Sequence, residues 1–137
     1  MGNLSLPIAG QAREVYGIEA QGSAIRSAVR NSEINQLSNC TFKKSDVVKG
    51  CRDLVTEKQC FDIVICDPPR RGMAELVELV AVVAEKRVVY VSCDPTTLCR
   101  DLAKLVERGF CIQAVQPIDM FPQTYHIETV VLLEKNR

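Results

Sequence analysis

One cysteine stands where a thiol is most easily made reactive. Cys93 follows the apolar, β-branched run Arg87–Ser92, which predicts a buried strand, and precedes Asp94 and Pro95, which are typical of a helix start. The thiol would then face a helix amino terminus, where the helix dipole and unpaired N–H groups favour a thiolate. Cys93 is therefore a candidate nucleophile. The alternative is a buried structural cysteine, since free cysteine is among the most buried residue types.

Acidic residues follow or end three other predicted strands: Glu19, Asp46 and Asp67. Ligands of α/β sheets collect beyond the carboxyl ends of the strands, so these residues and Cys93 would face one crevice. An acid that ends the strand after a glycine loop commonly accepts hydrogen bonds from ribose hydroxyls, which suits Glu19. The alternative for Glu19 is a solvated strand-end charge, and Asp46 could instead cap a helix beginning at Val47.

The sequence Asp67-Pro68-Pro69-Arg70 is more specific. The two prolines remove backbone donors and keep the chain extended after a buried strand, which would fix the Asp67 carboxylate at the crevice rim. A rigid turn with a surface acid is the alternative. Arg70 and Arg71 form a local basic pair that could reach a phosphate, or could simply be solvated.

A second group of polar residues lies near the end of the chain. Residues 121–128 predict a loop that runs into the last strand, and a partly desolvated Glu128 at that junction could act as a base. His126 is the only histidine. It is more often structural than catalytic in such a setting, because no partner base is visible in the sequence.

Composition limits the class of protein. The chain has 137 residues, 47% hydrophobic and 25% charged, which suits one globular domain. Seventeen basic and seventeen acidic residues cancel, so no overall basic field would hold nucleic acid. Seven cysteines contain no C-x-x-C pair, which argues against a zinc site. Several lie in apolar runs, and no signal peptide or membrane-length apolar stretch is found, so we expect a reducing, cytoplasmic setting.

The pattern along the chain alternates short β-branched runs with amphipathic stretches, which predicts βαβ units on a mostly parallel sheet. Helix 23–35 is expected to place Ala24, Ile25, Ala28, Val29 and Ile34 on its inner side. Two late strands, with no helix between them, predict an antiparallel end to the sheet. The expected strands are 14–19, 40–45, 61–66, 87–92, 111–116 and 129–134, and the other expected helices are 47–57, 73–85 and 95–108.

Four motifs in order, GNLSLPIA, DPPRRG, VVYVSCDPTTLCRD and PQTYHIETVVLLEK, resemble the S-adenosylmethionine-dependent RNA (uracil-5-)-methyltransferase family. The resemblance is closest to its branch acting on large-subunit ribosomal RNA and covers essentially the whole chain. It implies a Rossmann-like methyltransferase fold, with Cys93 as nucleophile and Glu128 as base. Asp67 and Arg70 would contact the RNA substrate. The residues that it implies contact S-adenosylmethionine are Asn3, Glu19, Asp46 and Asp67.

The chain also departs from the family pattern. A glycine turn and a short helix open it with no strand before them, so we expect that residues 1–137 are part of a catalytic domain whose RNA-binding parts lie elsewhere. A short natural protein is the alternative. In the related fold, the missing strand lies centrally, between the strands ending at Glu19 and Asp67. Its absence would leave two unpaired inner edges, which predicts closure of the gap with distortion or strand exchange between chains.

The resemblance thus implies methyl transfer from S-adenosylmethionine to carbon 5 of a uridine in RNA, ribosomal rather than transfer RNA, through a covalent cysteine adduct. Residues 1–137 alone are expected to be inactive. The alternatives are a non-catalytic methyltransferase-like binding module and an amino-group methyltransferase using Asp-Pro-Pro. A dinucleotide-dependent dehydrogenase fits least well, because the glycine pattern is incomplete.

Overall fold

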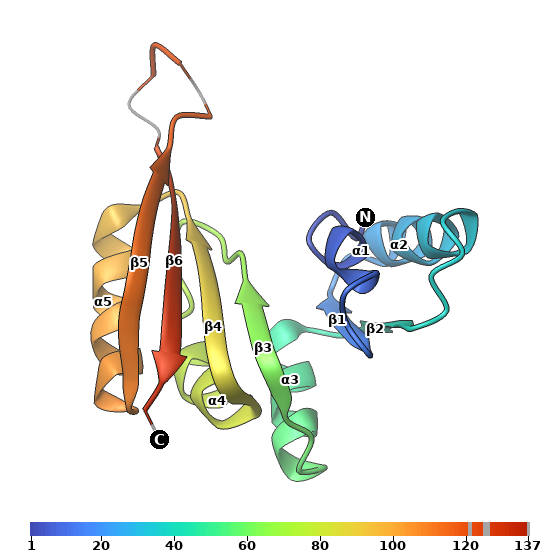
Figure 1. Cartoon of the computed structure of the whole chain (residues 1–137), viewed down its shortest axis with the longest axis horizontal. Coiled ribbons are helices and arrows are strands. Elements are labelled where there is room, and N and C mark those ends of the chain that lie inside the picture. Colours follow the sequence, from blue (N-terminus) through green and yellow to red (C-terminus); the bar gives the residue numbers. More distant parts are fainter. Residues whose placement is uncertain (121, 125–126, 137) are drawn as a thin grey trace. The chain divides into compact units, whose positions relative to one another are not determined.

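The computed structural model describes residues 1–120, 122–124 and 127–136, and its chain forms two compact units, Met1–Gly50 and Cys51–Arg137 (Figure 1). Each unit has its own sheet. The expectation of one catalytic domain for the whole chain stays a prediction. None of the described helices is long and apolar enough to cross a membrane.

The first unit is a βαβ arrangement preceded by a short helix. Parallel strands β1 and β2 pair in register from Val15 opposite Cys40 to Glu19 opposite Lys44. Gly17 on β1 is required by close packing, because a Cβ there would lie 2.9 Å from the Phe42 ring. The elements are α1 (Ser5–Ala9), β1 (Val15–Glu19), α2 (Gly22–Ile34), β2 (Cys40–Lys44) and the beginning of α3 (Val47–Thr56).

The inner side expected for α2 is partly wrong. Val29 and Ile34 are 39% and 65% exposed, whereas Ala28 and Ser32 are buried. Ser32 can be buried because its hydroxyl donates a hydrogen bond to the Val29 carbonyl, at 2.7 Å, within the helix. The helix therefore packs along a narrow stripe of small side chains rather than along its larger apolar residues.

The second unit has a four-stranded sheet in the order β3-β4-β6-β5. Strand β4 pairs with β3 in parallel and with β6 antiparallel, and β5 pairs with β6 antiparallel. This mixed arrangement confirms the predicted antiparallel end. The elements are the rest of α3, β3 (Phe61–Cys66), α4 (Leu76–Val83), β4 (Ala84–Ser92), α5 (Pro95–Glu107), β5 (Phe110–Ile118) and β6 (Glu128–Lys135).

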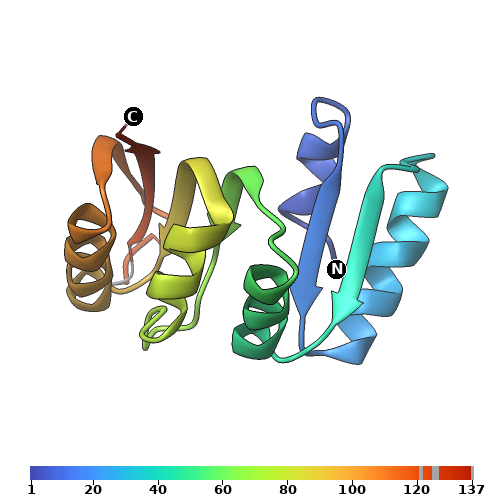
Figure 2. The same cartoon turned by 90° about the horizontal axis from the view of Figure 1, so that it is seen from below.

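Helices α4 and α5 cover one face of this sheet (Figures 1 and 2) and form its core with the side chains beneath them. Side chains alternate along a strand, so every second residue of β4 and β6 faces the helices. Each fully buried apolar side chain of this kind contributes about 1.5–3 kcal/mol to folding. The fully buried members include Val77, Val88, Tyr90, Leu105, Phe110, Val131 and Leu133.

Strand β4 begins earlier than the sequence predicts. The expected helix 73–85 ends at Val83, and Ala84 already pairs with Phe61 of β3. The run Leu76–Ala84 contains one charged residue, so hydrophobic periodicity could not separate a buried helix from a buried strand. The remaining elements agree with the expected ranges to within two residues at each end, apart from the starts of α4 and β4.

Among the described residues, β1 pairs only with β2, and β3 only with β4. An edge strand leaves a row of backbone N–H and C=O groups free to pair with another chain. Closure of the expected gap and exchange of strands between chains both stay predictions.

Candidate active site

Cys93 lies in a tight turn between β4 and α5, and is half-buried. The hydroxyl of buried Ser92 closes the turn: it accepts a hydrogen bond from the Asp94 N–H at 3.2 Å and donates one to the Asp94 carbonyl at 3.1 Å. The backbone on both sides of Cys93 is therefore held by one side chain.

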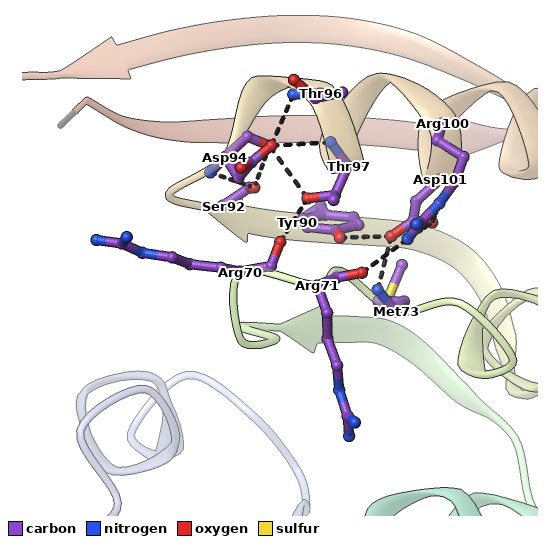
Figure 3. A network of polar contacts seen from close by, with 10 residues as sticks. All are labelled: Arg70, Arg71, Met73, Tyr90, Ser92, Asp94, Thr96, Thr97, Arg100 and Asp101. Atoms are coloured by element: carbon purple, nitrogen blue, oxygen red, sulfur yellow. Dashed lines mark hydrogen bonds and ion pairs between the residues drawn. The ribbon is translucent and has the colours of Figure 1, made fainter. Parts of the chain in front are cut away.

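Asp94 caps α5 as the sequence predicts. Its Oδ1 atom accepts hydrogen bonds from the N–H groups of Thr96 at 2.9 Å and Thr97 at 3.0 Å, and Pro95 occupies the first turn (Figure 3). The Thr97 N–H is the largest cause of the lowered pKa of the Asp94 carboxyl, and the positive charge of Arg70 contributes. Cys93 thus follows a buried strand and precedes a capped helix amino terminus.

Glu128 and Cys93 come from neighbouring antiparallel strands. The last pair of the β4–β6 ladder is Ser92 opposite Thr129. Cys93 directly follows Ser92 and Glu128 directly precedes Thr129, so both residues lie next to the same terminal pair of the ladder. Both are half-buried.

Asp67 belongs to the same edge of the sheet. It follows Cys66, which pairs with Tyr90 on β4, and its side chain is exposed. The residues adjacent to the three candidates, on the helix-covered side of the sheet, are Cys66, Ser92 and Thr129. Alternation along β6 therefore assigns Glu128 to the opposite face, while Asp67 and Cys93 lie just beyond the ends of β3 and β4.

The loop after Asp67 is attached to α5 by three hydrogen bonds. The Thr97 hydroxyl donates to the Arg70 carbonyl at 2.9 Å, and the Arg100 guanidinium donates to the Arg71 carbonyl at 2.9 Å. The third bond runs from the Met73 N–H to Asp101 Oδ2, at 2.6 Å. Figure 3 shows all three donors and acceptors between the loop and the first turns of the helix. The Arg70–Met73 segment is thereby fixed against the helix that begins beside Cys93.

Asp101 lies at the centre of this network and has no exposed surface. Its Oδ2 atom also accepts a hydrogen bond from the Tyr90 hydroxyl at 2.8 Å, and its Oδ1 atom pairs with the Arg100 guanidinium at 2.9 Å. Burial, followed by the hydrogen bond to Asp101, raises the pKa of Tyr90. Every buried side-chain nitrogen and oxygen in the described part of the chain has a hydrogen-bond partner, so this network is satisfied.

The side chains of Arg70 and Arg71 extend away from the network in Figure 3 and are exposed. Their backbone carbonyls accept hydrogen bonds from α5, whereas their side chains lie at the surface. That placement is compatible with the predicted contact to phosphate, which stays a prediction.

Another cysteine next to the candidate site has a different environment. Burial raises the pKa of the Cys66 thiol to about 12, and neighbouring Cys51 adds to the shift. A thiol with this pKa stays protonated near neutral pH and is a weak nucleophile. Cys66 is therefore not an alternative to Cys93.

The first unit brings two of the predicted cofactor contacts to one edge of its sheet. Glu19 ends β1, and Asp46 follows β2 two residues after Lys44, the partner of Glu19. Glu19 is exposed and its Oε1 atom accepts a hydrogen bond from the Gln21 N–H at 2.8 Å. Asp46 Oδ1 accepts one from the Lys49 N–H at 3.1 Å, so Asp46 does cap α3. Asn3 is exposed in the turn before α1.

His126 lies outside the described residues. Sequence reasoning missed Tyr90, Ser92, Arg100 and Asp101, although one signal was present. Residues 98, 102 and 105 form the buried stripe of α5, and position 101 belongs to the same stripe. An acid on the apolar face of a helix requires buried hydrogen-bond donors, which could have identified the Asp101 network.

The chain has the same fold as solved methyltransferases. A ribosomal RNA methylase from Streptococcus thermophilus superposes with a TM-score of 0.77 at 16% identity, covering 99% of this chain and 81% of that one. A magnesium protoporphyrin IX methyltransferase from Synechocystis PCC 6803, solved with bound SAM, gives 0.72 at 19% identity, with 98% and 65% covered. These similarities confirm the predicted Rossmann-like α/β methyltransferase fold.

Sequence comparison defines the family. The chain belongs to the tRNA (uracil-5-)-methyltransferase family, whose model matches residues 1–136. It is 43% identical over 136 residues to an RNA methyltransferase of Geobacter sulfurreducens, covering 98% of this chain and 28% of that protein. It is 38% identical to the 23S rRNA (uracil(1939)-C(5))-methyltransferase RlmD of Vibrio campbellii, covering 99% and 31%. The chain therefore spans about three tenths of the length of these relatives.

Proposed function

We propose that the protein containing residues 1–137 transfers a methyl group from S-adenosylmethionine to carbon 5 of a uridine in RNA. The observation that carries this proposal is that a half-buried thiol, Cys93, and a half-buried carboxylate, Glu128, both adjoin the last pair of the β4–β6 ladder. Membership of a family described by uracil-5 methylation supports the choice of base. The relative that acts on 23S rRNA favours ribosomal RNA over transfer RNA.

The thiol is needed because carbon 5 of uracil is too weak a nucleophile to attack a methyl sulfonium unaided. The Cys93 thiolate forms a bond to carbon 6, and the electron pair of the 5,6 double bond moves toward the carbonyl at carbon 4, giving an enolate. Sulfur suits both directions of this step, since it attacks readily and leaves again. The amino terminus of α5 begins at Pro95, two residues after Cys93.

When bound, S-adenosylmethionine would supply an electrophilic methyl group to carbon 5 of the enolate, and its sulfur would keep the electron pair of the broken S–CH₃ bond, giving S-adenosylhomocysteine. Glu128 then removes the remaining proton from carbon 5. The electron pair of that C–H bond restores the 5,6 double bond and breaks the bond between Cys93 and carbon 6. Cys93 returns as a thiolate, and Glu128 later releases its proton to solvent. Asp67, at the same edge, orients the base.

The residues of the first unit suit the cofactor chemically. Hydroxyl groups of a ribose and the amino groups of adenine and methionine are hydrogen-bond donors, which require acceptors. Glu19 and Asp46 are exposed carboxylates, and each accepts a backbone hydrogen bond through one of its oxygens. Asn3 supplies a further exposed amide. We assign these three residues, with Asp67, to the cofactor.

Residues 1–137 have no net positive charge with which to attract RNA. Arg70 and Arg71 are exposed on the loop that follows Asp67, and each could pair with a backbone phosphate. The target uridine must leave its stack to reach Cys93, which costs a few kcal/mol and costs less in a single-stranded loop. We therefore propose that the substrate is an unpaired or loop uridine.

Two other functions predict different arrangements. A non-catalytic binding module gives no reason for Cys93 and Glu128 to adjoin the same end of the β4–β6 ladder, whereas this placement supports their working together. An amino-group methyltransferase that uses Asp-Pro-Pro requires no nucleophilic thiol beside this motif. A thiol and a carboxylate at the same end of the β4–β6 ladder favour carbon methylation over both.

The function is tested by following the hydrogen on carbon 5. The intact gene product is incubated with S-adenosylmethionine and ribosomal RNA carrying tritium at carbon 5 of uridine. Carbon-5 methylation must release tritium to water in step with methyl incorporation, because Glu128 removes that hydrogen. Methyl incorporation without tritium release would indicate an amino-group methyltransferase. Neither signal, with RNA and cofactor both bound, would support the binding module.

A further inference from the structure

Asp101 is a buried acid that the proposed reaction does not use. It has no exposed surface and accepts hydrogen bonds from the Tyr90 hydroxyl and the Met73 N–H, while pairing with Arg100. Tyr90 lies on β4, three residues before Cys93, and Met73 ends the loop that begins at Asp67. The Asp101 carboxylate therefore connects β4, which leads to Cys93, with the loop that begins at Asp67.

The loop packs tightly against the side chains of Asp101 and Arg100. Gly72, immediately before Met73, has a φ of +75°, and a Cβ there would lie 2.5 Å from Asp101 Oδ2 and 2.6 Å from Arg100 Nη2. The loop therefore approaches the carboxylate as closely as backbone can. Thr97 and Arg100 bind the carbonyls of the two preceding residues, so the loop is held at consecutive positions (Figure 3).

We propose that Asp101 is a positioning residue, which holds the Asp67 loop in a fixed placement against Tyr90 and the Cys93 turn. This inference rests on the proposed function. Asp101 touches no substrate, and acts through the Met73 N–H on one side and the Tyr90 hydroxyl on the other.

A carboxylate suits this role because both of its oxygens accept hydrogen bonds. Two oxygens that only accept can satisfy the Tyr90 hydroxyl, the Met73 N–H and two guanidinium hydrogens at once. An asparagine has one acceptor oxygen, and its amide NH₂ would point at a donor on one side. Asp101→Asn therefore keeps the shape of the side chain while breaking part of the junction.

A positioning role and a merely structural role give different kinetics. RNA containing 5-fluorouridine is mixed with the intact gene product and S-adenosylmethionine, and the covalent adduct is followed with time. Loss of folded protein lowers the final amount of adduct without changing the rate constant for the molecules that react. Misplacement of Asp67 relative to Cys93 lowers the rate constant while the final amount stays near that of wild type.

We expect the rate constant of Asp101→Asn to fall by roughly tenfold to a hundredfold, as misplacements of about an ångström do. Glu107→Gln, at the exposed end of the same helix, is the matched control and should react like wild type. Tyr90→Phe removes only the hydroxyl donor and should show a smaller fall in the same constant. It decides the question if Asp101→Asn does not fold.

The outcomes separate the two proposals. An unchanged rate constant in Asp101→Asn, or in Tyr90→Phe where Asp101→Asn is unfolded, overturns the positioning role while leaving the proposed function intact. Wild-type protein that forms no adduct at all overturns the proposed function instead. A reduced final amount with an unchanged rate constant shows that Asp101 acts on stability alone and also overturns the positioning role.

Discussion

Cys93 directly follows Ser92 and Glu128 directly precedes Thr129, and Ser92 and Thr129 form the last pair of the β4–β6 ladder. The two residues are far apart in sequence and become neighbours only because β6 runs antiparallel between β4 and β5. The antiparallel end of the sheet is thus what brings the proposed base to the proposed nucleophile.

This placement predicts a specific defect for Glu128→Gln. Glutamine cannot accept the proton of carbon 5, so the methylated base should remain bonded to Cys93. We expect release of product to slow by about a hundredfold or more, and a methylated protein–RNA complex to accumulate on denaturing gels. Glu134→Gln, on the same strand but paired with Arg87, is the control. Normal turnover by Glu128→Gln would exclude this residue as the base.

Gly72→Ala should destabilise the second unit. The position has a φ of +75°, and the added methyl would collide with Asp101 and Arg100. We expect a loss of about 1–3 kcal/mol in unfolding free energy from backbone strain, with steric displacement adding to it. Gly10→Ala is the matched control, because its φ is −66° and a Cβ there meets nothing within 4 Å. Equal denaturant midpoints for the two variants would contradict the close approach at Gly72.

Asp94 should make the start of α5 sensitive to acid. Its pKa is lowered in the folded chain, chiefly by the Thr97 N–H, so its charged form is favoured by folding. This contribution is present above the unfolded Asp pKa of about 3.9 and is lost as pH falls through the lower folded value. Asparagine also caps helices but carries no charge.

The test of this pH dependence compares wild type with Asp94→Asn in urea at several pH values. The advantage of wild type over the variant should be greatest near neutral pH and should shrink below about pH 4. A difference in unfolding midpoint that stays constant across this range would show that the carboxylate charge at Asp94 contributes nothing.

Much of the architecture follows from local signals. Asp94 and Pro95 mark the start of α5, and Gly109, with a φ of +89°, follows its end, as the sequence predicts. The Leu76–Ala84 run was different, because an apolar stretch without periodicity suits a buried helix and a buried strand equally. Only the pairing of Ala84 with Phe61, a contact distant in sequence, decides where β4 begins.

Some residues of the candidate site could also be predicted from local sequence signals, and others could not. Cys93 and Asp67 could be identified locally, because each follows a recognisable strand end. Tyr90 and Asp101 could not be assigned their roles, since a tyrosine on a strand and an acid on a helix acquire meaning only when β4, α5 and the Asp67 loop meet. Val29 and Ile34 were expected on the inner side of α2 but are exposed, because helical spacing predicts which residues share a face and not how much of that face other elements cover.

The assignment of Cys93 as the nucleophile is tested most directly by locating the covalent bond between protein and RNA. In 5-fluorouridine RNA, a fluorine replaces the hydrogen on carbon 5. After methyl transfer, Glu128 therefore has no proton to remove, and the adduct is trapped. Trypsin cleaves after Arg87 and Arg100 and yields one peptide that contains both Cys93 and Cys99. Fragmentation by mass spectrometry should place the methylated fluorouridine on Cys93, in wild type and in Cys99→Ala alike, and Cys93→Ala should form no adduct. An adduct on Cys99, or one that survives in Cys93→Ala, would contradict the assignment of Cys93 as the nucleophile.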